Sequence, residues 1–215
     1  MADSIEVSFV LTGDRGEPQL EAIRERVDNK QEYRADWGRD DEYVYAAREI
    51  EEDVFGVHLF EHSPDSDWYT LPTRQAIELE ISTHDLTLGE DVETRVSTVL
   101  KFVQTVYAAT VECRYAFGLD TEHVGGIGED WGPDKPVTDE SLAENRINEV
   151  SWLTLFGPEL VVEYGREWLL SAPAWKREEL DDGAILLVAS PDPTDYEQFS
   201  EDRDILRTYF SRRGN

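Results

Sequence analysis

The chain contains a single cysteine, Cys113, among its 215 residues. One cysteine cannot form an intramolecular disulfide, and it cannot supply the group of thiolates that structural zinc sites use. Cys113 has apolar neighbours near the end of a predicted helix, so we expect a small buried side chain there. Disulfide-stapled folds and cysteine-based zinc modules are therefore excluded.

Lysine is also scarce. Of the 20 basic residues only Lys30, Lys101, Lys135 and Lys176 are lysines, and they stand against 48 acidic residues, which gives a net charge of −28. The acidic residues are spread along the chain, and no basic stripe is present that would release counterions from nucleic acid. We therefore expect no direct binding of nucleic acid.

Such a charge opposes compaction at ordinary ionic strength, whereas at molar salt the Debye length falls to about 3 Å and the repulsion is screened. The composition resembles that of proteins from halophilic archaea, which combine abundant Asp and Glu with little Lys. This resemblance implies a salt-loaded cytoplasm. The alternative interpretation is an acidic surface that binds a basic partner.

Long apolar runs are absent as well, since the longest is near "AILLVA" at 184–189. A membrane-spanning helix needs about 18 or more such residues. The first residues, "MADSIEVSFV", lack the basic region and apolar run of a signal peptide. We expect no membrane association and a cytoplasmic location.

The chain has enough apolar material to fold, with 40% hydrophobic residues, six Trp, nine Tyr and eight Phe. In the first half, apolar alternation predicts strands at 4–12, 53–62 and 76–84, and helical spacing predicts helices at 18–30 and 91–112. Alternation of Ile77, Leu79 and Ile81 with Glu78, Glu80 and Ser82 indicates a sheet with one face in water. Residues 32–52 carry no clear pattern.

The second half repeats this order. "EVSWLTLFG" predicts a strand, "PELVVEYGREWLLSA" a helix with Gly165 inside it, "WKREELDDGAILLVAS" a hairpin at Asp182 and Gly183, and the last segment a helix whose N-cap is Thr194 or Asp195. A short helix is expected from Thr138. The fold class is therefore α+β, with a mainly antiparallel sheet covered by helices.

The matching order of elements predicts two βαββα halves, or one continuous domain. The boundaries are an N-terminal half at 1–120, a connection rich in Gly and Pro at 121–147, and a C-terminal half at 148–215.

The segment "HLFEH" places His58, Glu61 and His62 in the H-x-x-E-H spacing of a zinc peptidase family. That chemistry requires a helix, in which residues four apart share one face and reach the same metal ion. The flanking residues favour a strand, in which four residues advance about 13 Å. We expect no metal and no cofactor, and a metal-dependent hydrolase built on these three residues is the alternative.

Three tryptophans follow Asp in predicted loops, namely Trp37, Trp68 and Trp131. Loop aromatics offer a large contact area at a small entropic cost, so these three are the candidate partner-binding residues. The alternative is that each packs as a lid on the core.

The order of Trp152, "FGPE", "YGREWLLSAP", a hairpin at "DDG" and a closing "DP", within 150–193, resembles the C-terminal module of a group of bacterial and haloarchaeal proteins. Some of these are similar to immunity proteins of polymorphic toxin systems. The resemblance implies a non-enzymatic, partner-binding role and identifies no functional residue. The leading hypothesis is thus a protein-binding module. The alternatives are the hydrolase and a small-molecule site between the two halves, and the oligomeric state stays open.

Overall fold

The structure is a computed structural model of the whole chain. It describes residues 4–11, 19–30, 32–50, 53–62, 75–87, 92–110, 112–120 and 136–212, and the account below is confined to them.

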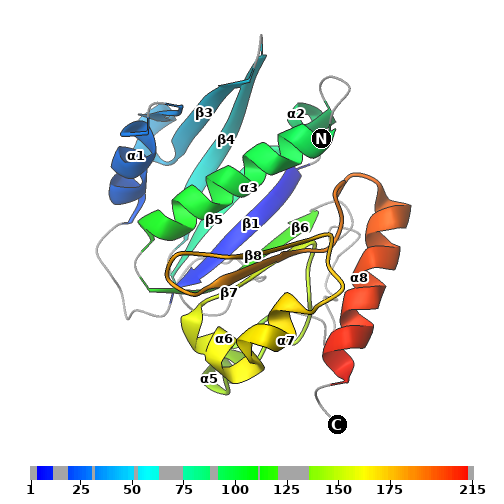
Figure 1. Ribbon diagram of the computed structural model, residues 1–215. Helices are drawn as coiled ribbons and strands as arrows, with labels where there is room; N and C mark the ends of the chain where they lie inside the picture. The colour runs from blue at the N-terminus through cyan, green and yellow to red at the C-terminus, as the bar shows by residue number, and fades with distance from the viewer. Residues whose placement is uncertain are drawn as a thin grey trace, which may run out of the picture.

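Nine strands form one sheet (Figure 1), and every strand pair in it is antiparallel. The strands are β1 (Ser4–Leu11), β2 (Arg34–Trp37), β3 (Val44–Ile50), β4 (Asp53–His62), β5 (Ala76–Ser82), β6 (Cys113–Asp120), β7 (Leu153–Phe156), β8 (Lys176–Glu179) and β9 (Ile185–Val188). Their spatial order is β2-β3-β4-β5-β1-β6-β7-β9-β8. The predicted α+β class with a mainly antiparallel sheet is confirmed.

The helices are α1 (Leu20–Asp28), α2 (Thr83–Thr87), α3 (Val92–Ala109), α5 (Asp139–Ala143), α6 (Pro158–Tyr164), α7 (Arg166–Leu170) and α8 (Tyr196–Ser211). A 3-10 turn, η1 (Arg39–Asp41), lies between β2 and β3. None of the described helices is both long and apolar enough to cross a membrane.

Helices α1 and α3 cover one face of the sheet, which we call the first face (Figure 1). Phe102 of α3 packs on Phe55 of β4 with ring centroids 6.0 Å apart. The side chains of Val57 and Leu59 share that face, because alternate strand residues point the same way. The β-branched stripe of α3 is thereby held by packing, as its low intrinsic helix propensity requires.

Helices α6 and α8 pack on the opposite, second face at the other end of the sheet. Phe156 of β7 lies opposite Tyr115 of β6. The Phe156 ring stacks on Phe210 of α8 at 5.8 Å and contacts Tyr164 of α6 at 5.3 Å. The two helical groups therefore bury different faces of one continuous sheet.

The glycines at 157 and 165 explain how the 152–170 segment folds. A Cβ on Gly157 would lie 2.6 Å from the carbonyl oxygen of Arg114, so this residue allows a close backbone approach. Gly165 has φ +85° and divides the predicted single helix into α6 and α7. A Cβ on Gly165 would meet no atom closer than 3.9 Å, so glycine is required there by the backbone conformation and not by lack of space.

Residues 32–50, for which the sequence gives no clear pattern, form β2, η1 and β3. Two local expectations were wrong. Cys113 begins strand β6 instead of ending a helix, although its side chain is buried as expected. Glu78 was expected to face water, yet it is 4% exposed. The remaining strand and helix predictions agree with the structure within a few residues, and Asp195 is the N-cap of α8.

The sheet runs without interruption from β1 through β6 into β7, so strands of both predicted halves are hydrogen-bonded neighbours. The first half also contains six strands, three more than a βαββα unit. The division at 1–120, 121–147 and 148–215 into separate units stays a prediction.

Candidate functional site

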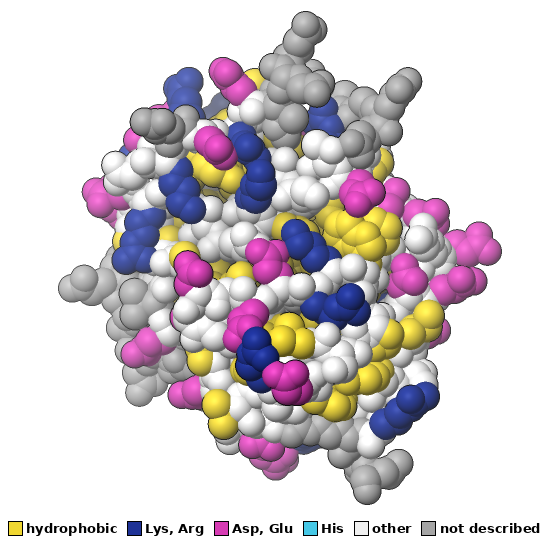
Figure 2. Space-filling model, in the orientation of Figure 1, with side chains coloured by type: hydrophobic (Ala, Val, Ile, Leu, Met, Phe, Trp, Pro, Cys, Tyr) yellow, Lys and Arg dark blue, Asp and Glu magenta, His cyan; other side chains and the backbone are white. Residues whose placement is uncertain are grey.

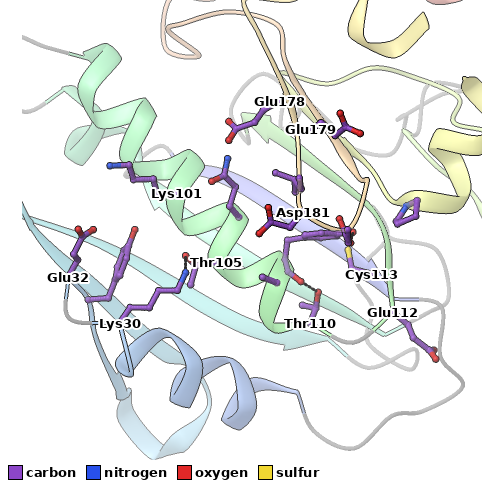
Figure 3. A pocket seen from close by; sticks show the side chains of 17 residues that line it. Lys30, Glu32, Lys101, Thr105, Thr110, Glu112, Cys113, Glu178, Glu179 and Asp181 are labelled. Atoms are coloured by element: carbon purple, nitrogen blue, oxygen red, sulfur yellow. Dashed lines mark hydrogen bonds between the residues drawn. The ribbon is translucent and has the colours of Figure 1, made fainter. Parts of the chain in front are cut away.

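A cleft of about 840 Å³ lies between α3 and the β8–β9 hairpin (Figure 3). Its helical wall carries four residues of one face of α3, namely Lys101, Gln104, Thr105 and Ala108. Its other wall is formed by the hairpin, from Glu178 to Asp182. The cleft thus joins elements that are far apart in the sequence, one from each predicted half.

Two contacts fix the walls. The Tyr107 hydroxyl donates a 2.6 Å hydrogen bond to Asp182 at the hairpin tip, and Asp182 also accepts the backbone N–H of Ala184. Arg26 of α1 donates to the carbonyl oxygens of Ala108 and Ala109, which satisfies the C-terminal end of α3. The cleft is therefore closed at the tip of the hairpin by a direct link between α3 and the turn.

Six carboxylates and two lysines line the cleft, and they belong to Glu32, Glu112, Glu178, Glu179, Asp181, Asp182, Lys30 and Lys101. Three of the carboxylates already have basic partners outside the lining: Arg166 binds Glu179 through two hydrogen bonds, Lys176 lies 3.3 Å from Glu178, and Arg48 lies 3.1 Å from Glu32. The hydrogen bond and charge of Arg166 lower the pKa of Glu179.

Asp181 differs from these carboxylates. It makes no hydrogen bond or ion pair within the part of the chain that the structure describes. Figure 3 shows its carboxylate projecting from the hairpin toward α3. Lys30, which also lines the cleft, donates to Thr105 at 3.0 Å. The centre of the cleft therefore presents a negative charge that a basic group would neutralise.

Acidic and basic side chains are interspersed on the molecular face that carries α3 and the hairpin (Figure 2). Despite the large negative net charge of the chain, this face is not uniformly acidic. The selective feature of this face is consequently the cleft itself.

Cys113 lies at the base of the cleft and is 8% exposed. Burial is the main reason that the pKa of its thiol is raised to about 12. A thiol with such a pKa stays protonated at neutral pH, so it is unsuited to nucleophilic chemistry. Its place in the cleft is that of a packed apolar side chain.

The three residues of "HLFEH" lie on β4, as the strand interpretation predicted, and they point to opposite faces. Glu61 lies on the first face, where its carboxylate accepts the N–H groups of Gln19 and Leu20 at 3.0 and 3.2 Å and so satisfies the N-terminal end of α1. His62 lies on the second face and bonds to Glu78 at 3.1 Å. No group of three or more potential metal ligands occurs among the described residues.

A row of acidic side chains crosses the second face, and it was not predicted from the sequence as a candidate site. Glu6 of β1 lies directly opposite Glu80 of β5, and Glu80 lies opposite His58 of β4. Burial, followed by repulsion from Glu78 and Glu80, raises the pKa of Glu6 to about 8. The alternation in "IELEIS" placed these glutamates on one face, but it could not reveal that the face is largely buried.

Of the three candidate tryptophans, Trp37 ends β2, is partly buried and packs against the core. Its indole N–H donates to Glu21 of α1 at 3.1 Å. Trp68 and Trp131 lie outside the described residues. The partner-binding role of these three residues stays a prediction.

The residues of the cleft could not be identified from the sequence. Tyr107 and Asp182 are separated by 75 positions, and no local pattern links them. The "DDG" turn signal did identify the hairpin correctly. An additional acidic residue before the Asp-Gly pair, Asp181, was the one available hint of a charged tip.

The sequence matches no protein-family model, and no curated protein matches it significantly.

Proposed function

We propose that the protein is a protein-binding module that holds a basic segment of its partner in the cleft between α3 and the β8–β9 hairpin. The observation that carries this proposal is the unpaired carboxylate of Asp181 at the centre of a cleft lined by six carboxylates. A guanidinium or ammonium group placed there would form a charge-assisted hydrogen bond with Asp181.

The rigidity of both walls supports binding. Tyr107 links the hairpin to α3, and Arg166 holds Glu179, so the backbone that carries Asp181 does not have to be ordered when a partner arrives. Preorganised groups lose less conformational entropy on association than mobile ones. The resemblance of 150–193 to immunity-type modules agrees with a partner-binding role, because the hairpin lies within that segment.

The test is affinity capture from the native host with the tagged full chain at molar salt, comparing wild type with Glu178→Lys/Asp181→Lys. The matched control is Glu197→Lys/Glu201→Lys, which makes the same charge change at exposed positions of α8. We expect one reproducible partner that the cleft variant loses and the control retains. A partner captured equally by the cleft variant, or no reproducible partner, would contradict the proposal.

The immunity-like form of the proposal has its own test. Co-expression with a toxin encoded beside this gene should protect a sensitive cell, and Glu178→Lys/Asp181→Lys should abolish protection. If cells that express the toxin and the wild-type chain still stop growing, the immunity-like role is contradicted, whereas binding to another protein partner is not.

We also propose that the protein works in a salt-rich cytoplasm, because a net charge of −28 is compatible with a compact fold only when repulsion is screened. The midpoint of thermal unfolding should rise continuously from about 0.1 M to molar KCl, well beyond the range in which ordinary surface charges are already screened. A midpoint that is flat over this range would refute the inferred habitat.

A small-molecule site is the second candidate, and the location of the cleft favours it because its walls come from both predicted halves. An apolar pocket would have supported this function more strongly, whereas charged and polar residues dominate this lining. A thermal-shift screen of small organic cations should separate the two functions. Stabilisation that disappears in Asp181→Asn would favour the small-molecule site.

A further inference from the structure

Strand β8 is the last strand at its end of the described sheet and pairs with β9 alone. The N–H of Leu180 donates to the carbonyl oxygen of Ala184, and the N–H of Ala189 points to Trp152 on the other side of β9, which together fix the phase of this antiparallel ladder. Because inward and outward backbone groups alternate, the N–H and C=O groups of Arg177 and Glu179 point away from β9. Strand β8 thus presents unpaired backbone groups at an open edge.

The far end of this edge borders the cleft. Glu178 and Glu179 line it on the strand side, and the face of α3 with Gln104 and Thr105 lines it on the other side. Figure 3 shows the hairpin and α3 facing each other, with Asp181 between them. A groove bounded by a strand edge and a helix has the geometry that receives an extended peptide as an added strand.

We propose that the partner's basic segment binds in extended form, adding to the edge of β8 at Glu179 and placing a basic side chain against Asp181. This inference rests on the proposed function and specifies the partner segment: a short strand in which basic residues recur at every second position. The backbone of the segment hydrogen-bonds to β8, and its alternate side chains enter the cleft.

The charge pattern of β8 supports selection of such a segment. Lys176 and Glu178 point to one side and form an ion pair, while Arg177 and Glu179 point to the other. Charged residues on an edge strand normally discourage pairing with unspecific strands. A segment that brings a cation toward Glu178 and Asp181 compensates the negative groups, whereas an apolar or acidic segment leaves them uncompensated.

The test uses a peptide probe of about eight residues in which Val and Arg alternate, which spans roughly 26 Å when extended. Two modified probes carry N-methyl groups, one on every Val amide and the other on every Arg amide. Only one of these two sets of amides faces β8 in an added strand. We expect one N-methylated probe to lose at least about ten-fold in affinity while the other binds like the unmodified peptide.

A variant of the protein tests the same contact from the other side. Glu179→Pro removes an N–H that points to the open edge, and proline is tolerated at such edge positions. The control is Glu179→Gln, which removes the same charge and keeps the N–H. We expect Glu179→Pro to bind the unmodified probe less tightly than Glu179→Gln does, with both variants keeping the wild-type near-ultraviolet circular dichroism spectrum.

The outcomes separate the two proposals. If both N-methylated probes bind like the unmodified peptide, and binding still requires Asp181, strand addition is overturned while the acidic cleft remains the binding site. If the unmodified peptide does not bind, or binds Asp181→Lys equally well, the proposed function fails together with the inference. If N-methylation affects only one of the two probes and Glu179→Pro binds less tightly than Glu179→Gln, strand addition at β8 is supported.

Discussion

Glu6 and Glu80 lie directly opposite each other in the register of β1 and β5, with Glu78 two residues away on the same face. Cross-strand residues of like charge repel each other, and the repulsion increases when water is excluded. This arrangement keeps the proton on Glu6 at neutral pH, because burial and the two neighbouring carboxylates raise its pKa to about 8.

The raised pKa of Glu6 predicts that stability falls as the pH rises. The folded state binds the proton more tightly than the unfolded chain, so the contribution is fully present below the unfolded-state pKa of 4.5 and is lost as the pH passes about 8. We expect Glu6→Gln, which resembles the protonated form, to raise the free energy of unfolding at pH 9 by ~1–3 kcal/mol after allowance for solvent screening. At pH 5 the two proteins should differ little.

Denaturant unfolding of both proteins at pH 5 and pH 9, in the same molar salt, measures this difference. Glu197→Gln on α8 is the matched control, since it removes a carboxylate at an exposed site. Equal pH dependence in wild type and Glu6→Gln would mean that Glu6 titrates normally in the folded protein.

The contact of Glu61 with α1 gives a second prediction. Its carboxylate accepts the N–H groups of Gln19 and Leu20 at the start of the helix, where backbone N–H groups have no intrahelical acceptor. We expect Glu61→Ala to lower the free energy of unfolding by ~1–2 kcal/mol, as loss of a helix cap does. Glu93→Ala, on the exposed side of α3, should change it by less than about 0.5 kcal/mol. Equal effects of the two substitutions would contradict the capping role.

Cys113 should be unreactive in the folded protein. Its thiol is buried and its pKa is about 12, so the reactive thiolate is scarce at pH 8. We expect a thiol-specific reagent to modify the native protein at least about 100-fold more slowly than the same protein in guanidinium chloride. Rapid modification without loss of structure would show that the base of the cleft is open to solvent.

Much of the fold could be predicted from the sequence where packing and local pattern agree. The alternation of "DVFGVHLFEH" gave β4 with its observed bounds, and the Asp182-Gly183 pair gave the hairpin. Strand β2 was not predicted, because it has only four residues and its charged residues obscure any alternation. The contact of Glu61 with the start of α1 was not predicted either, because Glu61 lies more than 40 positions from the helix that it stabilises.

The candidate site could not be predicted for a related reason. Asp181 stands out because its neighbours Glu178, Glu179 and Asp182 are already bound, and that distinction exists only once Lys176, Arg166 and Tyr107 are in place around them. In a chain with 48 acidic residues, charge alone marks no position. Only the tertiary structure shows that the neighbouring carboxylates have partners and that the Asp181 carboxylate does not.

The hydrogen bond between Tyr107 and Asp182 gives the last prediction, which concerns the hairpin wall of the cleft. Tyr107→Phe keeps the ring and removes the donor, so Asp182 loses its link to α3. We expect a loss of ~1 kcal/mol in the free energy of unfolding. We also expect faster amide hydrogen exchange confined to 178–184, because the hairpin tip opens more often.

Hydrogen exchange followed by mass spectrometry measures the local effect, and Tyr45→Phe is the matched control because Tyr45 is 39% exposed and far from the hairpin in the sheet order. Faster exchange at the hairpin in Tyr107→Phe but not in Tyr45→Phe would identify this hydrogen bond as the element that holds the cleft wall. Unchanged exchange there would mean that the Arg166 contact with Glu179 is sufficient to hold the hairpin, and that the cleft keeps its shape without Tyr107.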